Sequence, residues 1–135
     1  MNMRPLLTPA DCSTGTWLPP VSWYQSRVLW REVGRRLPHH PEVLATARTY
    51  LEIALETGEH ACSPQYLHRW RELIEQGIAA VVEVLTSVDD NEGQVLRSCS
   101  PAPFLSLISE QERNRLFDLV KWEVRALRHN EARAA

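Results

Sequence analysis

The spacing of hydrophobic and polar residues predicts a chain of α-helices. Apolar residues recur at steps of three and four, which places them on one face of a helix; Trp30, Val33 and Leu37 are an example. The pattern predicts five helices, over residues 22–37, 41–58, 63–77, 78–85 and 109–129. A short turn over residues 104–108 precedes the last of them.

Residues that start and stop helices support these bounds. Pro41 suits the first turn of the second helix, and Gly58 suits its left-handed end. Ser109 and Glu112 have the spacing of a capping box at the start of the last helix. We expect that helix to end near His129.

The stretch after residue 77 allows a second interpretation. Residues 78–85 are nearly all apolar and suit a buried helix, but valine also suits a strand. Residues 84–88 and 95–99 could pair as a hairpin across the acidic turn 89–93. An isolated hairpin needs packing support, which favours the helix. We therefore expect an all-α fold, a compact bundle of about five helices, with an α+β fold containing one small hairpin near residues 82–99 as the alternative.

Residues 1–20 have the composition of an arm outside the helical bundle. They contain four prolines together with serine, threonine and glycine, so we expect an extended or flexible segment. The apolar residues of this arm that can dock onto the core are Leu6, Leu7, Trp17 and Leu18. The chain length suits one domain, which we place at residues 21–129, followed by a frayed tail at 130–135.

The number and spacing of the cysteines indicate reduced thiols. Cys12, Cys62 and Cys99 are odd in number and far apart, which suits a cytosol better than a disulfide framework. The N-terminal residues lack the apolar core of a signal peptide, and no apolar run is long enough to span a bilayer. We expect a cytoplasmic protein with no membrane partner. Arginine outnumbers lysine 14 to 1, which suggests the base composition of a bacterial genome.

The first predicted helix carries a local excess of positive charge, although the net charge of the chain is only −2. Arg27, Arg31 and Arg35 stand at four-residue spacing beside Tyr24, on the side opposite the tryptophans. Only Glu32 offsets the arginines of this helix, so solvent, the acidic turn or a partner must neutralise them. Guanidinium groups beside a tyrosine are typical of surfaces that bind phosphates or acidic proteins.

The last predicted helix carries a tryptophan on its polar side. Trp122 lies opposite the apolar stripe, with Asp118 and Arg125 one turn away and Arg115 and His129 two turns away. Another segment could cover this ring, or it could anchor an interface, because tryptophan and arginine dominate binding hot spots.

Candidate chemistry is weak elsewhere. His60, Cys62, His68 and Cys99 supply enough atoms for zinc but lack the paired spacing of zinc sites. The sequence has no phosphate-binding glycine loop, no zinc-protease motif and no nucleophile elbow. We therefore expect no cofactor, no metal and no small-molecule substrate.

These patterns favour a protein that binds rather than catalyses. We expect a small non-enzymatic regulator of the antitoxin, inhibitor or adaptor type that binds a protein partner or forms a homodimer. The residues expected to bind are Tyr24, Arg27, Arg31, Arg35, Arg115, Trp122, Arg125 and His129. The alternative is a nucleic-acid-binding regulator that contacts phosphates through the arginine face. An enzyme with an active site dispersed along the chain is a third possibility.

Overall fold

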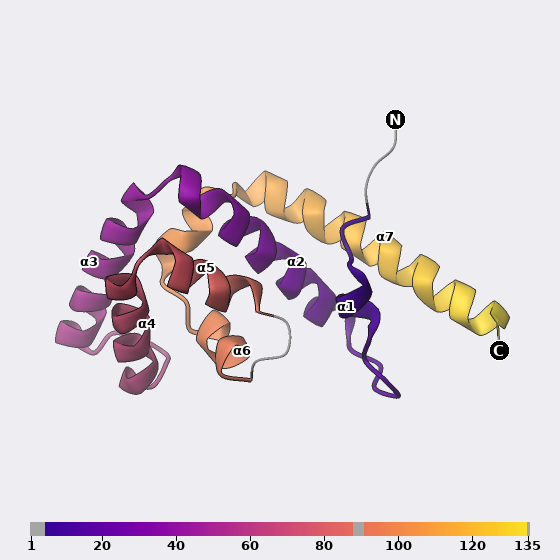
Figure 1. The fold of residues 1–135 in the computed structure, drawn as a ribbon, viewed down its shortest axis with the longest axis horizontal. Helices are drawn as coiled ribbons and strands as arrows, with labels where there is room; N and C mark the ends of the chain where they lie inside the picture. The colour runs from indigo at the N-terminus through magenta and orange to yellow at the C-terminus, as the bar shows by residue number, and fades with distance from the viewer. Residues whose placement is uncertain (1–4, 88–90, 135) are drawn as a thin grey trace. The chain divides into compact units, whose positions relative to one another are not determined.

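Helices form all the regular secondary structure in the computed structural model, which describes residues 5–87 and 91–134. No strand occurs in these two ranges, so the predicted all-α class is confirmed. The α-helices are α1 (Pro9–Cys12), α2 (Val21–Arg36), α3 (Glu42–Thr57), α4 (Pro64–Gln76), α5 (Ile78–Thr86), α6 (Asn91–Ser98) and α7 (Glu110–Ala134) (Figure 1). Two 3-10 helices, η1 (Leu37–His39) and η2 (Ala102–Leu107), connect them.

The predicted number of helices was too low. Five of the observed helices, α2, α3, α4, α5 and α7, correspond to the five that the sequence pattern predicts, whereas α1 and α6 are additional. The hairpin alternative is wrong, because the segments on both sides of the acidic turn are helical. Within that turn, Asp89 and Asp90 lie outside the described residues.

The ends of the helices follow the predicted signals at most positions. Gly58 ends α3 in the left-handed conformation, with φ of 71°, and Pro64 occupies the first turn of α4. The expected end of the last helix near His129 is wrong, because α7 continues to Ala134. Residues 130–134 contain no glycine or proline and include good helix formers, so nothing in them stops the helix.

The chain packs as two units, which we describe separately. Unit 1 consists of Met1–Leu29 and Glu110–Ala135, and unit 2 consists of Trp30–Ser109. Helix α2 supplies its first part to unit 1 and its last part to unit 2. This division concerns packing alone, so the single domain expected at residues 21–129 stays a prediction.

The core of unit 1 forms between α2 and α7. Tyr24 and Val28 from α2 pack against Val120 and Val124 from α7. Partly buried residues surround this cluster: Leu6, Leu7, Val21, Trp23 and Leu116. Both helices therefore bury one face against the other.

Within unit 1, part of the N-terminal arm packs against α7 and forms the short helix α1. The backbone N–H groups of Leu6 and Leu7 donate to the carboxylate of Glu123, at 2.9 and 3.2 Å. Thr8 and Asp11 then form a reciprocal capping box around α1. The expected docking of Leu6 and Leu7 is confirmed by their contact with the core.

The expected docking of the other two apolar residues of the arm is largely wrong. Leu18 is 67% exposed. Trp17 is 53% exposed and forms an edge-to-face ring pair with Trp23, with centroids 5.4 Å apart. The arm therefore presents these two side chains to solvent.

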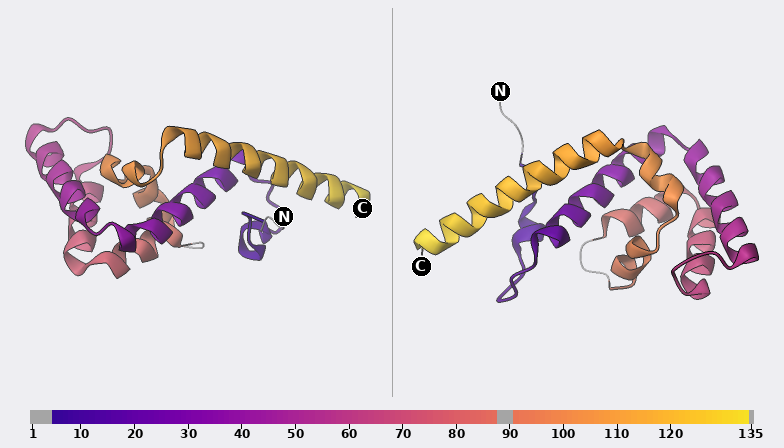
Figure 2. Two further views of the ribbon diagram at one scale, coloured as in Figure 1. Left: turned by 90° about the horizontal axis from the view of Figure 1, so that it is seen from above. Right: turned by 180° about the vertical axis from the view of Figure 1, so that it is seen from behind.

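The core of unit 2 centres on Trp70 of α4 and Phe104 of η2. Both side chains are fully buried, and their rings meet edge to face with centroids 5.5 Å apart. Helix α4 lies beside α3 and α5 (Figure 2). The Trp70 indole N–H donates to the carbonyl oxygen of Leu96, at 2.8 Å, which ties α6 to α4.

A buried arginine holds the other side of α6. Arg97 is 7% exposed and donates to the carbonyl oxygen of Val84 in the last turn of α5, at 2.7 Å. A cation at the C-terminal end of a helix also interacts favourably with the helix dipole. The sequence pattern missed this eight-residue helix, because so short a segment depends on tertiary contacts.

A disulfide links two segments of unit 2. This bond overturns the prediction of reduced thiols for two of the three cysteines. Cys62 in the loop before α4 is bonded to Cys99 after α6, with Cα atoms 5.9 Å apart. Cys12 is free and exposed. Disulfides persist in oxidising compartments and are rare in the cytosol, so the cysteines no longer favour a cytoplasmic location.

Candidate protein interface

The outer side of α7 carries an exposed aromatic residue in a row of polar ones. Trp122 is 63% exposed. Exposed side chains precede and follow it at alternating steps of four and three residues, and we call this set the Trp122 face: Gln111, Arg115, Asp118, Trp122, Arg125 and His129. The prediction that Trp122 points away from the apolar stripe is confirmed, and no segment of the described chain covers it.

The inner side of α7 explains why Trp122 is exposed. Val120 and Val124 are buried in the core of unit 1. Trp122 lies about 200° from each of them around the helix axis, because successive residues are rotated by about 100°. The adjacent Glu123 holds the N-terminal arm. Burial of the valines therefore turns the indole towards solvent.

The exposed indole is held by a neighbouring cation. The guanidinium carbon of Arg125 lies 5.2 Å from the centroid of the Trp122 ring. This distance suits a cation–π interaction, worth about 0.5–1 kcal/mol at an exposed site. The pair thus presents a flat aromatic surface with a fixed positive charge beside it.

Two residues of the predicted arginine face of the first helix, Tyr24 and Arg27, have largely buried side chains. Tyr24 is 4% exposed, so its expected outward position is wrong. Burial raises the pKa of the Tyr24 hydroxyl, an effect that the positive charge of Arg128 partly offsets. Tyr24 faces α7 because it packs with Val28 against Val120 and Val124, and Trp23 is only partly buried against the same cluster.

Arg27 points inward to a buried carboxylate. Its Nε lies 3.1 Å from Oδ1 of Asp11, whose side chain has no exposed surface. The guanidinium also lies over the Trp23 ring, 4.3 Å from its centroid. Asp11 came from the segment expected to be flexible, so the sequence pattern did not reveal this ion pair.

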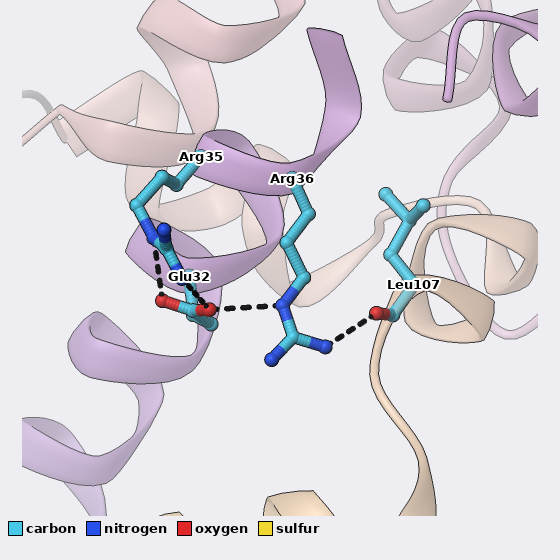
Figure 3. A network of polar contacts seen from close by, with 4 residues as sticks. All are labelled: Glu32, Arg35, Arg36 and Leu107. Carbon is cyan, nitrogen blue, oxygen red and sulfur yellow. Dashed lines mark hydrogen bonds and ion pairs between the residues drawn. The ribbon is translucent and has the colours of Figure 1, made fainter. Parts of the chain in front are cut away.

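The remaining arginines of α2 lie in unit 2, where Glu32 organises two of them. The Glu32 carboxylate accepts hydrogen bonds from Arg35 and Arg36, and Arg36 also donates to the carbonyl oxygen of Leu107 at 2.8 Å (Figure 3). The hydrogen bond from Arg35 is the main cause of the lowered pKa of Glu32. Arg31 is partly buried.

The acidic turn was one of the counter-charges expected for this helix, and its described residue Glu92 contacts α4. Glu92 accepts a hydrogen bond from Arg69 of α4, at 2.9 Å. Both side chains line a polar pocket between α4, α5 and α6. Glu32 is therefore an observed counter-charge of Arg35 and Arg36, whereas Glu92 pairs with Arg69 of α4.

The cysteine and histidine set cannot bind zinc in this arrangement. The sulfur atoms of Cys62 and Cys99 are bonded to each other, so neither is a thiolate ligand. No group of three histidine, cysteine or acidic side chains that could hold a metal ion occurs within residues 5–87 and 91–134. Cys12 is exposed, and partial desolvation together with the negative charge of Asp11 raises the pKa of its thiol.

Sequence reasoning missed a second exposed apolar surface, on α3. Tyr50 and Ile53 are 38% and 56% exposed. Together with Thr49 and Pro103 they line a shallow groove. Their spacing of three residues places both side chains on one side of α3, and this is the signal that could have revealed the surface.

Comparisons with known proteins supply no family for this chain: models of protein families, curated proteins and solved structures all give no match. Among the described helices, none combines the length and the apolar character that a membrane span requires.

Proposed function

We propose that this chain acts by protein binding through the Trp122 face of α7, as a small non-enzymatic regulator of the inhibitor, antitoxin or adaptor type. The observation that carries the proposal is the 63% exposure of Trp122 beside Arg125 on a regular helix. Tryptophan and arginine are enriched at the centre of protein interfaces. A rigid helix also presents them with little loss of conformational entropy on binding.

The nucleic-acid alternative has less support. A phosphate-binding surface needs several cations that are free to contact the backbone. Arg27 pairs with Asp11, Arg35 pairs with Glu32, and Arg128 donates to the carbonyl oxygen of Pro19. An affinity for DNA or RNA that falls steeply with added salt would revive this alternative.

The test compares two exposed tryptophans. Trp122→Ala should weaken partner binding by about 30-fold, because hot-spot residues contribute roughly 2 kcal/mol or more. Trp17→Ala is the matched control, since Trp17 is 53% exposed in the same unit. Quantitative affinity purification with each variant measures the effect, and circular dichroism checks that both remain folded. Equal recovery of every partner by both variants would contradict the proposal.

A further inference from the structure

We propose that the occupant of the Trp122 face is the same face of a second copy of this chain. The two α7 helices run antiparallel, with the two Trp122 rings near a two-fold axis. This inference rests on the proposed function, which it deepens by naming the partner. It is carried by the spacing of the Trp122 face and by the order of its charges.

The spacing of the face suits pairing with another helix. Its six positions, from Gln111 to His129, alternate in steps of four and three residues, and all six are exposed. This repeat averages 3.5 residues, so the six side chains form a continuous row, here called the seam, that stays aligned along a partner helix. The seam extends for about 27 Å at a rise of 1.5 Å per residue. A helix of 25 residues such as α7 is long enough to present it without interruption.

The charges of the face are self-complementary in one orientation. When two copies run antiparallel about Trp122, Arg125 of each copy lies opposite Asp118 of the other. Two-fold symmetry then forms the same ion pair twice. A parallel pair would place Arg125 against Arg125 and Asp118 against Asp118, and such like-charge contacts oppose association. Charge order therefore selects the antiparallel arrangement.

The centre and the ends of the seam contribute differently. At the centre, each Trp122 loses its solvent exposure against the other copy, and two aromatic rings in contact add about 0.5–1.5 kcal/mol beyond the buried area. At the ends, Arg115 lies opposite His129 and supplies no attraction. A seam with one apolar residue per copy is small, so we expect a reversible dimer with a dissociation constant on the order of micromolar.

The experiment is sedimentation velocity on the purified full chain over a range of about 0.1 to 100 μM. The wild type should shift from monomer to dimer within this range. Asp118→Arg should raise the dissociation constant at least about tenfold, because it places like charges opposite each other at two positions. The double variant Asp118→Arg/Arg125→Asp should restore dimerisation to within about threefold, because the exchanged charges attract again.

A charge reversal elsewhere provides the control. Glu56→Arg on the exposed side of α3 makes the same change in net charge and should leave dimerisation unaltered. A monomeric wild type at every concentration would overturn the inference. A dimer that Asp118→Arg does not weaken, or that the double variant does not restore, would also overturn it.

These failures are distinguishable from failure of the proposed function. If the purified chain is monomeric but Trp122→Ala still loses a different partner, only the identity of the partner was wrong. If the chain dimerises and Trp122→Ala has no effect on the dimer or on any other complex, both proposals fail.

Discussion

A buried ion pair shows how single residues fix the arm onto unit 1. Asp11 has no exposed side-chain surface and accepts hydrogen bonds from the backbone N–H of Thr8 and from Arg27. Such a pair contributes little relative to an apolar pair, but loss of one member leaves the other charge buried. The arm is therefore sensitive to the removal of either charge.

At this scale we expect Arg27→Met to lower the free energy of unfolding by about 3 kcal/mol, because the buried Asp11 carboxylate would lose the ion pair with the guanidinium. Urea unfolding at neutral pH measures this. Arg35→Met is the control: the Arg35 side chain is 73% exposed, so the loss of its pair with Glu32 should cost less than about 1 kcal/mol. The expectation is wrong if the two variants lose equal stability.

At the scale of the helix, α2 contributes side chains to two cores, and it does so from a different face in each. Tyr24 and Val28 pack in unit 1, whereas Trp30, Val33 and Leu37 are buried in unit 2. A helix that changes its packing partners along its length has no single apolar stripe. The tryptophan spacing alone therefore misplaced Tyr24.

Gly34 sets how closely α2 can approach α5 within unit 2. A Cβ atom at this position would lie 2.7 Å from Cγ2 of Thr86. The Thr86 side chain has little freedom to move away, because its hydroxyl donates to the carbonyl oxygen of Val82 at 2.8 Å. A methyl group at position 34 and Cγ2 of Thr86 therefore cannot both fit without a shift of one helix.

We expect Gly34→Ala to destabilise the fold by about 1–2 kcal/mol, because overpacking exceeds the gain in helix propensity. Adding Thr86→Ser should recover most of this loss, since it removes Cγ2 and keeps the hydroxyl. Thermal unfolding followed by circular dichroism compares the single and double variants. A stabilised Gly34→Ala variant would show that the two helices can move apart at little cost.

At the scale of the whole molecule, each of the two units is stabilised by a different set of internal interactions. Unit 1 relies on apolar packing between α2 and α7 and on the docked arm. Unit 2 has a larger core and also the Cys62–Cys99 disulfide, which links positions 37 residues apart. Reduction should therefore affect one unit more than the other.

We expect the double variant Cys62→Ser/Cys99→Ser to lose about 3–4 kcal/mol of stability in unit 2, the loop-closure value for a loop of this length. Hydrogen exchange should show the loss in α4 and α6, with the amides at the α2–α7 core of unit 1 unchanged. Cys12→Ser is the control, because that thiol is free and exposed. Unchanged exchange in α4 and α6 would mean that packing alone holds this part of unit 2.

The sequence by itself determined the features that depend on neighbouring residues. Helical spacing, Gly58 and Pro64 set the helix bounds, because steric preferences act within one or two turns. The outward position of Trp122 followed from the same periodicity, since Val120 and Val124 must face inward. The all-α class and the centre of the candidate interface could therefore be predicted from the sequence without any tertiary contact.

Only the tertiary structure decided the features that join distant parts of the chain. The Cys62–Cys99 bond, the Arg27–Asp11 pair and the burial of Tyr24 each depend on which segments meet, and periodicity carries no information about that. Helix α6 is the same case, because eight residues form a stable helix only when contacts such as Trp70 to Leu96 hold them. The long-range Arg27–Asp11 pair thus removed one arginine from the predicted surface, and the exposed Trp122 left α7 to carry the candidate site.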